Sequence, residues 1–251
     1  MLREVFIVQS GLDEIGKRSR WPARLDVVQS LSGLALALFM WGHMFFVASI
    51  LLGADVMWAI TKLFEGYFFL GQSYPRLVSG VVAVVIALFV VHALLALRKF
   101  PINYRQYITV RAHAQAMKHG DTTLWLWQAH TGFMLFFLAS AHLYQMLVWP
   151  QNIGPYASSD RIWSDGLWPF YLVMLLTVEL HGGIGLYRLA LKWGWPPLSR
   201  HSLHWLKWLL TAFFLILGLA TLGAYMKIGF EHRQHYGERY TPTWGIEGEE
   251  R

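Results

Sequence analysis

Residues 166–187 read GLWPFYLVMLLTVELHGGIGLY, and this stretch decides the fold. Glu179 is its only acidic or basic side chain, and the segment is long enough to cross a hydrocarbon core of ~30 Å as one helix. A charged side chain at the centre of such a helix costs about 3 kcal/mol or more. A membrane-spanning helix that holds Glu179 and His181 near its middle therefore needs a reason to keep them.

Four other long runs also lack acidic and basic side chains, at residues 27–54, 77–97, 122–159 and 208–226. The third run is too long for one helix, and Pro150 is expected to end its helix near Trp149. We predict a single all-α membrane domain with a polar tail at 231–251 and no internal repeat. Its five transmembrane helices are expected near residues 26–52, 76–98, 122–149, 168–192 and 204–229.

The composition supports this class and excludes several kinds of site. The chain of 251 residues is 55% hydrophobic and 14% charged, which is too apolar for an ordinary soluble domain. It contains no cysteine, so it can hold no disulfide, no cysteine-ligated iron–sulfur cluster and no thioether-linked haem. The first 26 residues are rich in charge and contain no apolar segment, so we expect no cleavable signal peptide.

Lys and Arg residues indicate how the helices are oriented. The segments up to residue 26, at 98–121 and at 188–207 carry five, five and four of them, whereas 55–76 and 150–165 carry two and one. The positive-inside rule places the first three segments in the cytoplasm. We therefore expect a multi-pass protein of the cell (inner) membrane with a cytoplasmic N-terminus and an external C-terminus. The net charge of +6 is explained by this topology, so we expect membrane lipid and no nucleic acid as a partner.

Four histidines fall at two depths in this topology. His92 and His181, the inner pair, lie ~9–11 Å from the cytoplasmic edge at a helical rise of 1.5 Å per residue. His43 and His142, the outer pair, lie ~12–18 Å from the outer edge. A lone transmembrane histidine is usually a packing residue, as we expect for His130, which has no partner at its depth. Two depth-matched pairs are instead typical of bis-histidine ligation of haem iron.

Small residues flank three of the four histidines, at Gly42, Ser140, Ala141, Gly182, Gly183 and Gly185. They would let a flat macrocycle approach the backbone, although ordinary helix packing also uses small residues. We predict two haem b groups inside a bundle of the first four helices, with the fifth helix packed alongside. Glu179 lies about 200° around its helix from His181, so it is expected to face away from the iron, either as a protonated packing residue or as a proton carrier.

Several motifs resemble a known family. They are RWPARLDVVQS, FMWGHMFF, RKFPINYRQY, KHGDTTLWLWQAHTGF and VELHGGIGLYRLALKWGW, beginning at residues 20, 39, 98, 118 and 178. The chain from about residue 18 to residue 227 resembles the di-haem cytochrome b subunits of menaquinol:fumarate reductases, within the succinate dehydrogenase/fumarate reductase cytochrome b family. The tail from Glu231 matches no motif of that family, and the segment GWPPLSRHSLHW resembles it more loosely than the rest, so no residue role is carried over there.

The resemblance implies roles for individual residues. His92 and His181 match the ligands of the haem nearer the cytoplasm, and His43 and His142 match those of the haem nearer the outer face. The resemblance also implies contacts to haem propionates from Gln29, Ser30, Trp125 and Lys192, and from Lys99, His119 and Arg161. Without it, Lys99 and Lys192 are typical interfacial lysines.

Two glutamates match residues that handle protons in the family. Glu65 matches a glutamate that accepts a proton from menaquinol near the outer haem, whereas by itself it resembles a solvated loop residue. Glu179 matches a glutamate of a proposed transmembrane proton pathway.

The function implied by the resemblance is the quinol-oxidising membrane anchor of a fumarate reductase. Its expected partners are a flavoprotein and an iron–sulfur protein on the cytoplasmic side, in a complex that forms a dimer of heterotrimers. The dicarboxylate site is not expected in this chain, because it has no flavin fingerprint and no cysteine.

Other functions remain open at this point. A succinate:menaquinone reductase anchor would share the haem ligands and the topology. A cytochrome b of a hydrogenase or formate dehydrogenase, a metal or proton transporter that uses His and Glu, and a purely structural anchor are further alternatives.

Overall fold

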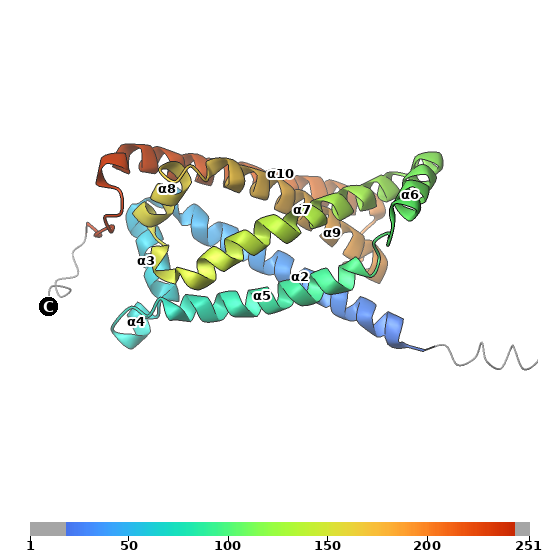
Figure 1. Cartoon of the computed structure of the whole chain (residues 1–251), viewed down its shortest axis with the longest axis horizontal. Helices are drawn as coiled ribbons and strands as arrows, with labels where there is room; N and C mark the ends of the chain where they lie inside the picture. Colours follow the sequence, from blue (N-terminus) through green and yellow to red (C-terminus); the bar gives the residue numbers. More distant parts are fainter. Residues whose placement is uncertain (1–18, 244–251) are drawn as a thin grey trace, which may run out of the picture.

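The computed structural model describes residues 19–243 and is entirely helical in its regular elements over that range. Expectations for the segment before residue 19 and for residues 244–251 of the polar tail lie outside the described residues. The helices are α2 (Trp21–Ala48), η1 (Ser49–Leu52), α3 (Ala54–Phe64), α4 (Tyr67–Leu70), α5 (Arg76–Leu97), α6 (Tyr104–Met117), α7 (Gly120–Val148), η2 (Pro150–Asn152), α8 (Pro155–Trp163), α9 (Trp168–Trp193), α10 (Arg200–His232) and η3 (Arg233–His235) (Figure 1).

Five of these helices are long and apolar enough to cross a membrane, which confirms the predicted fold class. They are α2, α5, α7, α9 and α10, and large apolar side chains such as Phe137, Leu209 and Ile216 are exposed on their outward faces. A soluble protein would bury such residues, whereas a lipid-facing surface is expected to display them. The boundaries differ at two helix starts: α2 begins at Trp21, with proline in its first turn, and α10 begins at Arg200.

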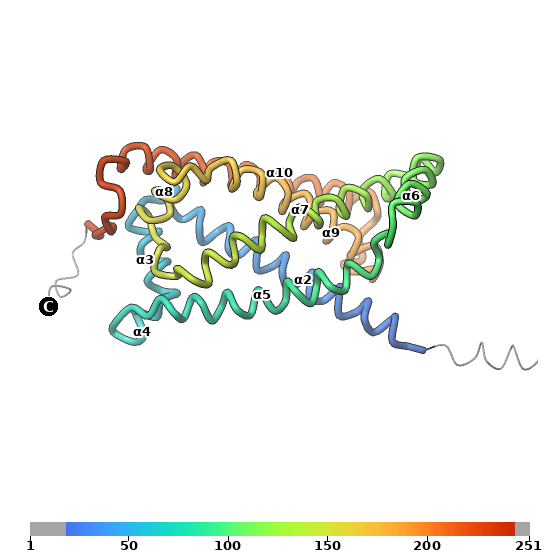
Figure 2. The backbone as a smooth tube through the Cα atoms, in the orientation of Figure 1, coloured from blue at the N-terminus to red at the C-terminus, as the bar shows by residue number. Residues whose placement is uncertain are grey.

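Four of the long helices form a closed ring. α2 packs against α5, α5 against α7, α7 against α9, and α9 against α2. α2 and α7 are therefore diagonally opposite, as are α5 and α9. α10 lies outside the ring, where it packs against α9, α2 and α8, as expected for the fifth helix (Figures 1 and 2).

The segments that connect the long helices are more helical than the sequence suggested. The short helices α3, α4 and α8 gather at one end of the bundle, and α6 lies at the opposite end (Figure 1). We call these the outer and the inner end, after the orientation expected from the sequence. α8 lies close to α10 because Gly229 has no side chain: a Cβ there would lie 2.5 Å from the carbonyl oxygen of Ser159. The outer end is therefore a packed layer rather than a set of free loops.

Candidate functional site

The inner pair comes from diagonally opposite helices. His92 is on α5 and His181 is on α9, and their rings face each other across the bundle with centroids 6.4 Å apart and planes at 89°. Both side chains are partly buried among apolar helices. The depth argument from the sequence therefore brought together two residues that are 89 positions apart.

Each ring of the inner pair is oriented by the helix beside it. Nδ1 of His92 lies 3.2 Å from the backbone carbonyl oxygen of Gln29 and 3.4 Å from Oγ of Ser32. Nδ1 of His181 lies 3.0 Å from the backbone carbonyl oxygen of Gln128 and 3.3 Å from Oγ1 of Thr131. A carbonyl can only accept, so Nδ1 carries the proton in both rings. The lone pair of each neutral imidazole is then on Nε2.

A glycine on the same neighbouring helix supports each ring. A Cβ at Gly33 would lie 2.7 Å from Cε1 of His92, and a Cβ at Gly132 would lie 2.8 Å from Cε1 of His181. These separations are too short for any side chain, so both positions require glycine if the rings are to stay in place. The sequence pointed to small residues beside the histidines on their own helices, and it missed these two.

The outer pair is also diagonal, with His43 on α2 and His142 on α7. The ring centroids are 6.2 Å apart with planes at 55°. Phe39 stacks on His43 at 5.9 Å, and Tyr171 meets His142 edge to face at 5.8 Å. Within residues 19–243, Nδ1 of His142 is buried and has no hydrogen-bond partner. Aromatic packing therefore holds this pair, in contrast to the hydrogen-bonded inner pair.

α2 and α7 carry the same spaced pattern, which corrects the expectation of no internal repeat. Gln29, Ser32, Gly33 and His43 correspond to Gln128, Thr131, Gly132 and His142, with each pair separated by 99 residues. In both helices the glycine supports an inner histidine, and the histidine ten residues later belongs to the outer pair. Ten helical residues rise ~15 Å, so both helices set the same distance between the two layers. Too few positions match for the repeat to stand out before the contacts are known.

Comparison with known proteins decides the family. The family described as "Succinate dehydrogenase/Fumarate reductase transmembrane subunit" matches residues 103–221. The fumarate reductase cytochrome b subunit of Wolinella succinogenes is 56% identical to this chain over 227 residues, covering 88% of this chain and 89% of the relative. The chain belongs to the fumarate reductase cytochrome b family. A second member, from Helicobacter pylori, is 52% identical over 220 residues, with 87% and 86% of the two chains covered.

A cytochrome b subunit implies haem, and both histidine pairs fit it. Two imidazoles that bind one metal ion from opposite sides, each through a bond of roughly 2 Å, have ring centres about 6 Å apart. The observed separations of 6.4 Å and 6.2 Å match this arrangement. Among residues 19–243 no cluster of three or more metal-ligating side chains is present.

The inner end of this cytochrome b subunit holds a cluster of cations. Nζ of Lys99 and Nζ of Lys192 lie 2.9 and 3.2 Å from the carboxylate of Asp26, and Arg98 lies 3.6 Å from it. Lys99 and Lys192 were expected near haem propionates, and the structure brings them together from α9 and the end of α5. Three cations around one carboxylate leave two positive charges uncompensated, which suits an anionic group with two carboxylates. The sequence did not predict the role of Asp26 between them.

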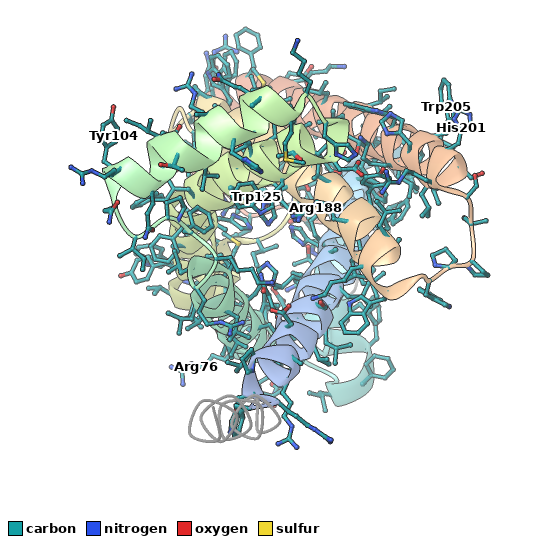
Figure 3. The ribbon with its side chains drawn as sticks, turned by 90° about the vertical axis from the view of Figure 1, so that its right-hand side faces the viewer. Arg76, Tyr104, Trp125, Arg188, His201 and Trp205 are labelled. Carbon is teal, nitrogen blue, oxygen red and sulfur yellow. The ribbon has the colours of Figure 1, made fainter. Side chains whose placement is uncertain are left out.

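The other residues expected near propionates lie in three places. Gln29 is at the inner end of α2, and its buried side-chain oxygen has no partner among the described residues, while Ser30 donates to the carbonyl oxygen of Asp26. Trp125 is partly buried on α7, and in Figure 3 it lies with Arg188 toward the middle of the bundle. His119 is exposed and precedes α7 as its N-cap.

Arg161 is at the outer end, far from this cluster. It is buried in α8, and its guanidinium donates to Tyr171 Oη at 3.1 Å and to the carbonyl oxygen of Asn152 at 2.7 Å. Because Tyr171 also contacts His142, Arg161 belongs to the surroundings of the outer pair.

Glu65 is a buried residue, which corrects its interpretation as a solvated loop side chain. Only 4% of it is exposed, in the turn between α3 and α4. Nζ of Lys62 lies 3.0 Å from its carboxylate and donates to Ser73 at 2.8 Å. The structure thus has a buried, paired carboxylate at the outer end, where the residue taken by itself suggested a solvated side chain.

Glu179 is the most deeply buried acidic side chain described, with 1% exposed. It is two residues before His181, about 200° around α9, and Trp41 of α2 interacts with its carboxyl group. Within the described part of the chain Oε1 has no hydrogen-bond partner. A buried carboxyl oxygen without a partner costs free energy, so the packing of α9 does not by itself explain why a glutamate occupies this position.

His130 has the minor role that the sequence suggested. It is exposed on α7, its Nδ1 lies 2.7 Å from the carbonyl oxygen of Leu126, and its ring meets Tyr107 of α6 at 6.4 Å. It therefore contributes to packing between α6 and α7.

Proposed function

We propose that this chain oxidises menaquinol for a fumarate reductase and carries electrons across the membrane through two haem b groups, one for each histidine pair. The observation that supports this most is the presence of two diagonal histidine pairs, with ring centroids 6.4 and 6.2 Å apart. Haem b would supply reversible one-electron transfer at each level.

The chain's own residues would bind and orient these groups. The four histidines would bind iron through Nε2. Gln29 and Gln128 would fix the two inner rings through their carbonyl oxygens, which also makes the imidazoles more basic. Lys99 and Lys192 would bind propionates at the inner end, and Arg161 would do so at the outer end.

Glu65 would accept a proton when menaquinol is oxidised. Oxidation of a quinol releases two electrons and two protons, and a carboxylate near the outer pair can take one of the protons. Its burial at the outer end supports this role, and the contact with Nζ of Lys62 at 3.0 Å holds the carboxylate in one orientation. Protonation of Glu65 would weaken that pair and free the side chain to turn toward water.

Glu179 would carry a proton through the middle of the bundle. Its burial, its unpartnered oxygen and its position on the face of α9 away from His181 support this role. A proton that moves in the same direction as an electron cancels its charge, so the transfer would not work against the membrane potential. Glu179→Gln keeps the shape and removes the titratable group, and it should slow turnover while both haems remain reducible by dithionite.

The partners would bind at the inner end, on the cytoplasmic side. α6 and its flanking segments present several Arg and Lys residues there, and a flavoprotein with an iron–sulfur protein would supply the fumarate site. The N-terminus would be cytoplasmic and the C-terminus outside. Two such complexes would form a dimer of heterotrimers.

The decisive experiment combines spectroscopy with turnover of the purified complex. A dithionite-reduced minus oxidised spectrum with a pyridine haemochrome assay should give two b haems per chain. Menaquinol-driven reduction of fumarate should be faster than menaquinone reduction by succinate. One haem per chain would refute one of the two pairs, none would refute electron transfer, and faster succinate oxidation would reverse the physiological direction.

A further inference from the structure

A cavity lies between α9 and α10, outside the ring of four helices. It has a volume of about 160 Å³ and is bounded by α2, α9, α10 and the segment after α9. Its wall is almost entirely apolar, with Leu34, Trp41, Leu186 and Leu203 among the lining residues. Lys207 of α10 is the only charged side chain in this wall. No step of the proposed electron transfer uses this cavity.

The ammonium group of Lys207 lacks an acceptor. Only 5% of the residue is exposed, and Nζ is buried with no hydrogen-bond partner among residues 19–243. Nζ lies 4.2 Å from the ring centre of Trp208 and 5.3 Å from that of Tyr187. These rings stabilise a cation, but they cannot accept its three hydrogen bonds as an oxygen would.

The surrounding charges leave an excess of positive charge. Asp121 is the carboxylate whose charge acts on Lys207, but it already accepts a hydrogen bond from Tyr187 at 3.0 Å and pairs with Arg200 at 3.3 Å. One carboxylate therefore faces two cations, and Arg188 adds a third nearby. A buried, unbalanced ammonium is costly, and an anion beside it would remove that cost.

The cavity lies at the depth of lipid head groups at the inner end. Lys207 is seven residues after the start of α10, a rise of ~10 Å. Trp195, Trp205 and Trp208 around it are exposed by 67%, 64% and 47%, and exposed tryptophans of this kind mark the membrane interface. Figure 3 shows Trp205 at the periphery of the bundle, where lipid can approach α10.

We propose that this cavity binds one anionic phospholipid. The lipid phosphate accepts hydrogen bonds from Nζ of Lys207, and the start of one acyl chain covers the apolar wall beside Trp195 and Leu206. Basic pockets between transmembrane helices at head-group depth recognise such lipids by charge and shape together. The surrounding membrane supplies the ligand.

The test uses the intact purified complex, stripped of lipid in detergent and then mixed with phosphatidylglycerol. Native mass spectrometry counts retained lipid, and phosphatidylglycerol with brominated acyl chains quenches nearby tryptophan fluorescence. The variants are Lys207→Met, which keeps the stem and removes the charge, and Lys207→Arg. Lys227→Met is the matched control, because it removes the same charge from the exposed outer part of the same helix.

We expect the parent complex, Lys207→Arg and Lys227→Met each to retain one phosphatidylglycerol tightly. Lys207→Met should lose this lipid, and the quenching of its tryptophan fluorescence should weaken tenfold or more. Phosphatidylcholine should not replace the phosphatidylglycerol. Equal retention in Lys207→Met would overturn the proposal. Displacement of the lipid by inorganic phosphate would also overturn it, since the site would then recognise a soluble anion. The haem spectrum of each variant verifies folding and does not depend on the lipid.

Discussion

The two histidine pairs of this cytochrome b subunit are built differently. At the inner pair each ring has a proton on Nδ1, a carbonyl and a hydroxyl that accept it, and a glycine against its edge. At the outer pair His43 and His142 are packed by Phe39 and Tyr171, and Nδ1 of His142 has no partner in the described range. Similar ring separations thus arise from polar anchoring at one level and aromatic packing at the other.

This difference shows how one bundle can give two similar ligand sets different properties. A hydrogen bond donated by Nδ1–H makes an imidazole a stronger electron donor to a metal and fixes its orientation. Packing by aromatic rings fixes orientation but leaves the basicity unchanged. We therefore expect the inner and outer sites to differ in how they respond to substitution.

The largest expected effect is the loss of one haem. His142→Ala should remove the outer haem and retain the inner one, and His92→Ala should do the reverse, because under the proposed assignment each pair would hold one haem. A pyridine haemochrome assay should give half the parental haem in each variant, and redox titration identifies which haem remains. Loss of the inner haem alone from His142→Ala would show that the pairing is wrong.

Gly33→Ala should displace His92, because the new Cβ would lie 2.7 Å from its Cε1. Overpacking of this kind typically costs ~1–3 kcal/mol, and the strain would fall on the inner site. Difference spectroscopy and thermal unfolding should show weakened inner haem and a lower midpoint of unfolding.

Gly42→Ala is the matched control on the same helix, because no atom lies within 4 Å of its Cβ position. It should keep both haems and the parental midpoint or a higher one, since alanine favours helices. If both variants behaved alike, the glycine would not be needed as a support for His92.

Thr131→Val should produce a smaller change, confined to the inner site. It removes a hydroxyl 3.3 Å from Nδ1 of His181 but keeps the shape and the bond to the carbonyl oxygen of Gln128. Loss of one hydrogen bond worth about 0.5–1.5 kcal/mol should raise the inner haem potential by ~20–60 mV, because the imidazole becomes a weaker donor. Potentiometric titration should leave the outer potential unchanged, and an equal shift at both levels would contradict the local explanation.

The smallest effect concerns the outer end, where residues 240–243 are held against the start of α3. Hydrogen bonds from Thr243 and Tyr240 keep the pKa of Asp55 below its usual 3.8. Because the folded pKa is the lower one, this contact is complete above about pH 4 and is lost as the pH falls through the folded pKa. The protection of the tail amides against hydrogen–deuterium exchange, taken relative to the intrinsic exchange rate at each pH, should fall in acid.

Asp55→Asn should raise the same exchange at neutral pH while both haems remain. Burial and the contact with Asp55 raise the pKa of Tyr240 to about 12, so alkaline release is expected only above the usual value of 10.0. Protection that does not change between neutral and acidic pH would show that Asp55 does not hold the tail.

The sequence predicted the parts of this structure that depend on chain length and charge. Five spans and the depth of each histidine follow from apolar runs and from the positions of Lys and Arg, which a bilayer requires. The support of His92 by Gly33 could not be predicted, because it depends on the rotation of α2 against α5. The same holds for Asp26 and Lys207, whose partners lie on other helices. Charge and spacing give the depth of a residue, but packing decides which way it faces.

The repeated pattern on α2 and α7 makes the inner site nearly two-fold symmetric about the bundle axis. His92 with Gln29, Ser32 and Gly33 on one side is matched by His181 with Gln128, Thr131 and Gly132 on the other. A planar molecule turned over about that axis would meet the same imidazole, carbonyl, hydroxyl and glycine on each face. The two faces of the inner site therefore offer the same set of contacts to such a molecule.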